Sequence, residues 1–294
     1  MRKILFALLV SSALFADECE PQHYSYWDVH PIHVGGNVLR LGSADVSDTP
    51  LKGHLYFRKS NAFLYMLVPV NSKSYFFPRV EWNTFTLNWN KNPKFNQTHF
   101  YYLQFALTFY TIQLEKWRWI ARVDYNLDTE HFNNPRQYGL FSALLWGSHE
   151  IHRKWHYHVG SVGYTGFSGQ EVYPIIGADY SPNKKWTFLL VFPIEYYIQY
   201  KYGDHWRFSL RGRPLKERFR TNNHQPQPRS VFSYSSTGLE ANVRYEIFLR
   251  LEAEIFGGWN FGGNFYIKNE KGHNSLYTDV GGSPYAGATL NWGF

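Results

Sequence analysis

The last ten residues of the chain alternate strictly between two kinds of side chain. Every second residue is apolar: Ala286, Ala288, Leu290, Trp292 and Phe294. The residues between them are small, polar or amphipathic: Tyr285, Gly287, Thr289, Asn291 and Gly293. Because successive side chains of a strand point to opposite faces, this pattern predicts a strand with one apolar face and one polar face.

A strand of this kind that ends in an aromatic resembles the closing strand of a bacterial outer-membrane β-barrel. The resemblance implies that Leu290, Trp292 and Phe294 form an assembly signal, and that the barrel-assembly machinery is a partner during biogenesis. Composition supports the prediction, since the chain is 20% aromatic and 18% charged, with a mean hydropathy of −0.43. An apolar outer band with aromatic girdles around a polar interior averages to such values.

The N-terminus predicts export. Arg2 and Lys3 precede an apolar run over 4–15 that is too short to span a bilayer, and Ala16 offers a cleavage point. We therefore expect a signal peptide over 1–16, a polar extension over 17–35, a barrel over 36–294, and location in the outer membrane. The single cysteine, Cys19, excludes a scaffold of internal disulfides. The net charge of +7 is modest and does not call for a nucleic-acid partner.

Period-two alternation dominates the chain from about residue 36 onward. In 117–127, for example, Trp117 and Val123 share one face while Arg118, Arg122 and Asp124 share the other. Repeated over many segments, this pattern predicts an all-β fold, an antiparallel transmembrane up-and-down β-barrel. Closure with both termini on one side needs an even number of strands; we expect about twelve, with ten or fourteen as alternatives.

Short polar turns precede tryptophan at four places. Trp117, Trp155 and Trp186 each follow a lysine, and Trp206 follows His205. Tryptophan prefers the membrane interface, and a neighbouring lysine can reach the headgroups. We expect these four aromatics at one rim of the barrel. Longer polar stretches are then expected as loops at the opposite rim, over 91–97, 128–137, 212–229 and 269–284.

The second half of the chain resembles an uncharacterised family of bacterial outer-membrane β-barrels. The resemblance rests on the segment Val-Tyr-Pro-Ile-Ile-Gly-Ala-Asp-Tyr-Ser-Pro-Asn-Lys-Lys-Trp over 172–186, on Leu-Val-Phe-Pro ending at 193, and on Tyr-Lys-Tyr over 200–202. It also rests on 238–245 and 251–257, and it covers roughly 170–294. The resemblance implies a β-barrel fold and an outer-membrane location, and it implies no particular activity.

The polar strand faces place many charges inside such a barrel. The predicted interior residues are Arg118, Arg122, Asp124, Asp179, Glu195, Lys201, Arg207, Arg211, Glu240, Arg244, Glu246, Arg250, Glu252 and Glu254. They could line a pore and set its ion preference, or they could fill a narrow lumen as salt bridges. Because both signs are balanced, the second interpretation is favoured.

Other motifs give weaker indications. The basic stretch 213–229 could contact lipopolysaccharide phosphates or fold into the pore, although a solvated loop is the simpler interpretation. His156 and His158 have acceptable metal-ligand spacing, as do His30 and His33, but nothing supplies a further ligand, so we expect no metal and no cofactor. Ser142, Ser161 and Ser168 lack the Gly-x-Ser-x-Gly motif of an activated nucleophile, and no catalytic residue is predicted.

Together these patterns predict an outer-membrane barrel, not an enzyme. Its role would be structural, or it would act as a narrow pore of low specificity for small solutes. Outer-membrane lipid and lipopolysaccharide are the expected surroundings. The alternatives are a surface binding or adhesion protein that uses its loops, an outer-membrane hydrolase, and a soluble secreted β-sandwich.

Overall fold

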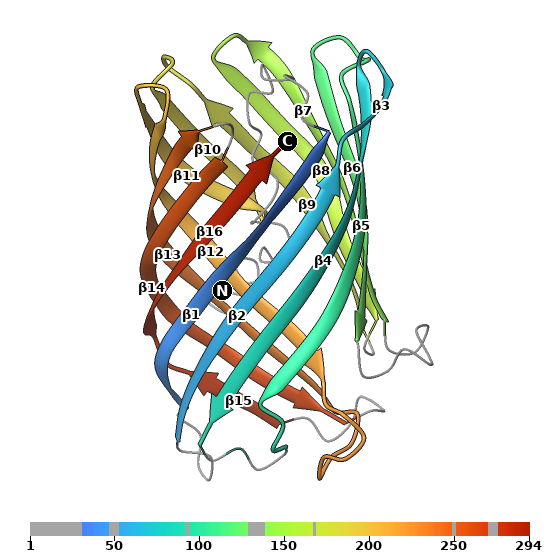
Figure 1. Cartoon of the computed structure of the whole chain (residues 1–294), viewed down its shortest axis with the longest axis vertical. Helices are drawn as coiled ribbons and strands as arrows, with labels where there is room; N and C mark the ends of the chain where they lie inside the picture. Colours follow the sequence, from blue (N-terminus) through green and yellow to red (C-terminus); the bar gives the residue numbers. More distant parts are fainter. Residues whose placement is uncertain are drawn as a thin grey trace.

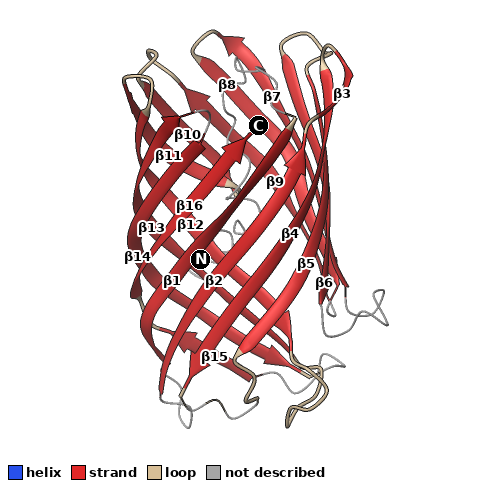
Figure 2. Cartoon of the chain, viewed as in Figure 1, coloured by secondary structure: helices blue, strands red, loops and turns tan. Residues whose placement is uncertain are grey.

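The computed structural model describes residues 31–46, 53–90, 92, 95–128, 139–166, 169–248, 251–269 and 276–294. Within these ranges all regular secondary structure is strand (Figure 2). No helix long and apolar enough to cross a membrane occurs in the described part of the chain. The expected signal peptide, and the expected extension up to residue 30, lie outside the described residues. β1 begins at Ile32, four residues before the expected start of the barrel.

The strands follow one another along the whole described chain. They are β1 (Ile32–Val46), β2 (Gly53–Met66), β3 (Val68–Asn71), β4 (Ser74–Trp89), β5 (His99–Thr111), β6 (Trp117–Asp128), β7 (Gly139–His152), β8 (Trp155–Gly166), β9 (Gly169–Tyr180), β10 (Trp186–Phe192), β11 (Glu195–Tyr202), β12 (Trp206–Arg220), β13 (Val231–Phe248), β14 (Leu251–Lys268), β15 (Leu276–Val280) and β16 (Ser283–Gly293).

Antiparallel pairing between neighbours closes these strands into one barrel (Figure 1). β1 pairs with β2 on one side and with β16 on the other, from His33 opposite Gly293 to Leu41 opposite Tyr285. β3 continues β2 and pairs, like β2, with β4. β15 and β16 both pair with β14 on one side and with β1 on the other. Sixteen strands therefore give fourteen positions around the barrel, 16 − 2. The barrel is confirmed, and its strand number is at the upper end of the expected range.

The two rims of the barrel differ. The terminal rim holds the start of β1 and the C-terminus, where Ile32 N donates to Phe294 O, together with the short turns 112–116, 153–154, 181–185 and 203–205. The strands on the opposite side, the loop rim, are joined over longer intervals, such as from Trp89 to His99 and from Arg220 to Val231. The four turns with tryptophan thus lie at one rim, as predicted. Short turns on the side of both termini are typical of outer-membrane barrels.

Alternate residues face outward and inward as the sequence pattern predicts. On β16, Leu290 and Trp292 are exposed on the outer face, whereas Tyr285 is buried inside; Phe294, which follows the strand, is also exposed. At the terminal rim, Trp155, Trp186 and Trp206 are also exposed on the outer face, and Trp117 is half-buried. These placements agree with an apolar band edged by aromatic residues.

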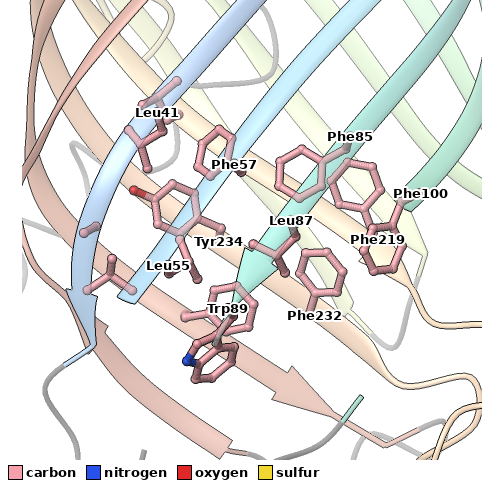
Figure 3. Packing of buried hydrophobic residues seen from close by; sticks show 14 of the residues in the cluster. Leu41, Leu55, Phe57, Phe85, Leu87, Trp89, Phe100, Phe219, Phe232 and Tyr234 are labelled. Atoms are coloured by element: carbon pink, nitrogen blue, oxygen red, sulfur yellow. The ribbon is translucent and has the colours of Figure 1, made fainter. Parts of the chain in front are cut away.

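Buried apolar side chains fill part of the interior near the loop rim, and we call this cluster the lumen core. Phe85 on β4 stacks on Phe219 of β12 with ring centroids 4.4 Å apart, and Phe57 on β2 meets Tyr234 of β13 at 5.2 Å. β4 and β12 are not neighbours in the sheet, so these contacts cross the interior (Figure 3). The core thus joins the wall formed by β1, β2, β4 and β5 to the strands β12, β13 and β14.

Two expected loops are partly strand. The basic stretch expected as a loop over 212–229 lies in β12 as far as Arg220 and pairs with β13 along its length. β15 occupies part of the loop expected over 269–284. Both segments carry charges and glycine or proline, which sequence patterns associate with loops. An inward contact helps to hold the first segment in the sheet, since Lys59 Nζ on β2 lies 3.1 Å from Glu217 Oε1 on β12.

Candidate functional site

One hairpin of the barrel is too short to complete the wall. β10 has seven residues and β11 has eight, whereas a strand needs about nine to eleven residues to cross a bilayer. Their turn follows Phe192, and Ile194 N donates to Val191 O within it. The wall between β9 and β12 is therefore missing from this turn toward the loop rim. We call this gap the notch.

The notch has two unpaired strand edges. β10 pairs with β9 only from Ile176 toward the terminal rim, and β11 pairs with β12 only as far as Gly212. Residues 169–175 of β9 and 213–220 of β12 thus have no strand partner on the notch side in the described chain. Pro174 and Pro214 lie in these two edges. Proline cannot donate to a sheet ladder and is confined to edges, so both prolines disfavour closure of the notch by strand pairing.

An ion bridge spans the notch. Lys216 Nζ on β12 lies 3.1 Å from Glu171 Oε2 on β9, and Arg218 Nη2 lies 3.4 Å from Glu171 Oε1. Tyr173 donates its hydroxyl to the same carboxylate at 3.0 Å. Lys216 also lies over the ring of Tyr164, with Nζ 4.6 Å from the centroid. Two cations and a phenol thus share one carboxylate, and this bridge links the side chains of the two edges directly.

Apolar side chains surround the bridge on both faces of the wall. Inside, a second buried cluster lies along β7 to β11: Leu144, Trp146, Val162, Tyr164, Ile175, Leu189, Val191, Ile194 and Tyr197. Outside, Val172, Ile176 and Leu190 are among the most exposed large apolar residues, at 75%, 67% and 66%. Apolar side chains thus lie on both faces of the wall beside the bridge.

Unpaired strand edges are unusual within the wall of a membrane barrel. Backbone N–H and C=O groups that face hydrocarbon without partners are costly, so irregular backbone within a membrane occurs where it is buried or lines a water-containing cavity. The interior does hold a cavity of about 30 Å³ beside the edge of β12, lined by residues that include Lys59, Arg213 and Glu217. That volume is enough for about one water molecule. Residues 213–217 of β12 thus line this cavity, and the same segment borders the notch.

The structure brings most of the predicted interior charges into pairs. Arg122 Nη2 lies 2.6 Å from Asp124 Oδ1, Arg244 Nη2 lies 2.7 Å from Glu254 Oε2, and Arg207 Nη1 lies 3.7 Å from Glu252 Oε1. Asp179 accepts from two histidines, and Glu240 pairs with Arg213. Their role as a pore lining stays a prediction.

The remaining predicted interior residues have other surroundings. Glu195 and Arg211 are buried, Arg118 and Glu246 are half-buried, and Lys201 Nζ lies 3.9 Å from Asp204 at the terminal rim. Arg250 lies outside the described residues. These placements do not assign a function to any of the five described residues.

Several interior charges were not predicted from the sequence. Arg79 and Glu81 form a buried pair on β4, with Arg79 Nη2 2.6 Å from Glu81 Oε2. Glu171 was not predicted either. Arg213, Lys216 and Arg218 belong to the basic stretch over 213–229, for which folding into the pore was one of the interpretations. Alternation on β4 could have identified the first pair. The bridge across the notch joins residues about 45 positions apart in sequence, and no local pattern indicates it.

The histidine and serine candidates contact acids. His156 Nδ1 and His158 Nε2 lie 2.8 and 3.0 Å from the two carboxylate oxygens of Asp179, and Trp146 Nε1 donates to His158 at 3.0 Å. Ser142 Oγ donates to Asp124 rather than to a histidine. No group of three or more metal-binding side chains occurs among the described residues. Ser168, His30 and the basic residues before 31 lie outside them.

Comparison with known proteins supports the fold. No protein-family model matches the chain. An uncharacterised protein of Chlamydia pneumoniae is 26% identical over 182 residues, which cover 61% of this chain and 57% of that protein. An uncharacterised protein of Chlamydia trachomatis is 20% identical over 314 residues, covering 99% of this chain and 97% of that protein. The crystal structure of the COG4313 outer membrane channel from Pseudomonas putida F1 matches with a TM-score of 0.53 and 9% identity, covering 94% of this chain and 100% of that one.

These matches confirm the resemblance to an uncharacterised outer-membrane barrel family. The chain spans 57% of the length of the Chlamydia pneumoniae relative and nearly all of the Chlamydia trachomatis one. The solved structure shares the architecture of an outer-membrane barrel at very low identity. The comparison therefore shows the fold, and the function has to be argued from the geometry.

Proposed function

We propose that this chain is a channel of the outer membrane through which small apolar or amphipathic solutes pass by way of the notch. The loop rim faces outward, and export depends on the signal peptide expected over 1–16. The observation that carries the proposal is the short β10–β11 hairpin, which leaves the wall open between β9 and β12. A solute dissolved in the outer leaflet could reach the interior there without crossing the loop rim.

The lumen core argues against a wide axial pore. Phe85 and Phe219 meet across the interior, and Lys59 pairs with Glu217 beside them. β12 thus divides the loop-rim half of the interior, with the lumen core against one face and the notch at the other. Lys216 and Arg218 lie on the face toward β9. A solute that enters through the notch meets the second apolar cluster and then the polar terminal-rim half, where Asp179 lies between two histidines.

Opening the ion bridge should increase passage of an apolar probe. In Glu171→Ala, Lys216 and Arg218 lose their shared carboxylate. Charges left unpaired in a low-dielectric site are unfavourable, so β12 is expected to move away from β9 or to admit water. We expect release of a trapped naphthylamine dye from liposomes that contain the folded chain to rise several-fold. Dye fluorescence outside the vesicles is the measurement.

A matched control removes an ion pair elsewhere in the interior. Glu252→Ala breaks the ion pair between Glu252 and Arg207, two side chains that are each about one-quarter exposed. This variant should leave dye release unchanged. Equal release from Glu171→Ala, Glu252→Ala and the parent chain would contradict a route through the notch. Ion conductance without dye release would instead favour the charge-lined axial pore predicted from the sequence.

A further inference from the structure

Two arginines lie side by side on the outer face of the barrel. Arg40 of β1 is directly opposite Arg58 of β2 in the antiparallel register, and both side chains are exposed. Directly opposed residues have Cβ atoms about 4.5–5.5 Å apart, and like charges at such positions destabilise a sheet. No carboxylate of the described residues pairs with either guanidinium. Two exposed guanidinium groups this close together favour the binding of an anion between them.

The same row of the sheet holds further polar groups. Arg58 is opposite Thr86 of β4, and Thr86 is opposite His99 of β5. Arg40, Arg58, Thr86 and His99 thus form one continuous row across four neighbouring strands, all on the outer face. Within this row both arginines, the hydroxyl and the imidazole can donate hydrogen bonds to an anion. We call it the outer polar row.

The outer polar row lies at the edge of the apolar band. Toward the terminal rim, the outer face carries Val34 on β1, Leu64 on β2 and Trp82 on β4, all well exposed. From Trp82 toward the loop rim, the outer face of β4 carries Thr84, then Thr86 of the row, then Asn88. Arg40 is the ninth residue of β1 from the terminal rim, and about nine to eleven residues cross the apolar layer. Arg40 and the opposite Arg58 are therefore level with the headgroups of the leaflet on the loop-rim side.

We propose that the outer polar row binds the phosphate of an outer-leaflet glycolipid of the lipid A type. A phosphomonoester carries about −1.5 to −2 charges and three acceptor oxygens. Two adjacent guanidinium groups match that charge and geometry, since arginine binds phosphate in a bidentate manner. The acyl chains of the lipid would then lie along the apolar outer face beside Leu64 and Trp82. This inference is independent of the notch.

The basic stretch of β12 is poorly suited to the same task. Arg213 is paired with Glu240, and Lys216 and Arg218 share Glu171. These three cations are largely buried, and their carboxylate partners already satisfy them. Lipid contact was one of the interpretations of 213–229, beside the simpler one of a solvated loop. The phosphate site is instead argued from Arg40 and Arg58, which the sequence did not single out.

Binding can be measured by native mass spectrometry of the full chain, folded in a neutral detergent and mixed with lipid A. We expect a retained lipid A, and weaker retention by about tenfold or more in the double variant Arg40→Gln/Arg58→Gln, since one charge-assisted hydrogen bond contributes about that factor. The matched control Lys184→Gln/Lys185→Gln alters two exposed cations in the turn at the terminal rim and should retain lipid A as the parent chain does.

The lipid source is separated from a free anion by two further arms. Lipid A stripped of phosphate should bind the parent chain as weakly as intact lipid A binds the double variant. Inorganic phosphate at millimolar concentration should not displace intact lipid A. Equal retention by the double variant, equal binding of the stripped lipid, or displacement by inorganic phosphate would each overturn the proposal. The stripped-lipid arm needs only the parent chain, so it decides the matter even if the variant does not fold.

Discussion

Replacing Phe232 with alanine is expected to lower the free energy of unfolding by about 3–5 kcal/mol. Phe232 is fully buried in the lumen core, where its ring stacks on Phe95 and Phe265 with centroids 5.3 and 5.5 Å away and meets Phe100 edge-on at 4.8 Å. Removing the ring leaves a cavity between β13 and the part of the wall formed by β5, which is not its sheet neighbour. The measurement is tryptophan fluorescence during urea titration of the chain folded in lipid vesicles.

Phe208→Ala is the control for the loss of aromatic surface alone. Phe208 is 40% exposed on the outer face of β12, where lipid can refill the space left by its ring. Phe208→Ala should therefore destabilise the barrel clearly less than Phe232→Ala does. If the two variants unfold at the same urea concentration as the parent chain, the interior near the loop rim is not packed as described, and the argument against a wide axial pore fails.

Replacing Glu240 with alanine should destabilise the barrel by a similar amount, about 3–5 kcal/mol, because it leaves one partner of a buried ion pair uncompensated. Arg213 Nε lies 2.5 Å from Glu240 Oε2, and both side chains are almost completely buried. The Arg213 guanidinium also lies over the ring of Phe256, with Cζ 4.4 Å from the centroid. The ring cannot replace the lost carboxylate. The same urea titration measures the effect.

Two comparisons show whether the effect arises from the buried charge. Lys201→Ala removes the exposed pair with Asp204 at the terminal rim and should change stability by less than about 1 kcal/mol. The double variant Arg213→Met/Glu240→Leu, which removes both charges, should recover most of the stability lost in Glu240→Ala. A double variant as unstable as Glu240→Ala would show that packing, and not the unpaired arginine, causes the loss.

The regular part of the barrel follows from alternation along the chain. On β16 the residues predicted to face lipid, such as Leu290 and Trp292, are those exposed on the outer face. The tryptophans predicted for one rim lie at the terminal rim, because each begins a strand after a short turn. A period of two is a local property, so it can be read without knowing which strands are neighbours. The strand number was less certain, since β2 and β3, or β15 and β16, share one position around the barrel.

The features that bear on function depend on contacts between distant segments. The stretch from Arg213 to Arg220 has charged and apolar residues on both faces, which favours a loop when the segment is considered alone. In the folded chain one face packs into the lumen core through Phe219, while the other meets Glu171 across the notch. Because neither partner is near in sequence, no local pattern could predict the division of the interior or the gap in the wall.

The proline residues at the notch are a partial exception. Pro174 and Pro214 both lie in strand edges that face the gap, and proline is expected at edges. From sequence alone each proline also fits a turn or a bulge. Only the lengths of β10 and β11, together with the pairing that ends at Ile176 and Gly212, show that the two prolines border the same opening.

Cross-linking the two edges of the notch tests the proposed route most directly. Glu171 and Lys216 contact each other across the gap, so cysteines at these positions are within reach of a short bis-maleimide; Cys19 is replaced by serine to leave only this pair. We predict that dye release from liposomes falls to the level of empty vesicles after cross-linking, while single-cysteine controls treated in the same way keep theirs. Undiminished release from fully cross-linked, folded protein would contradict passage through the notch.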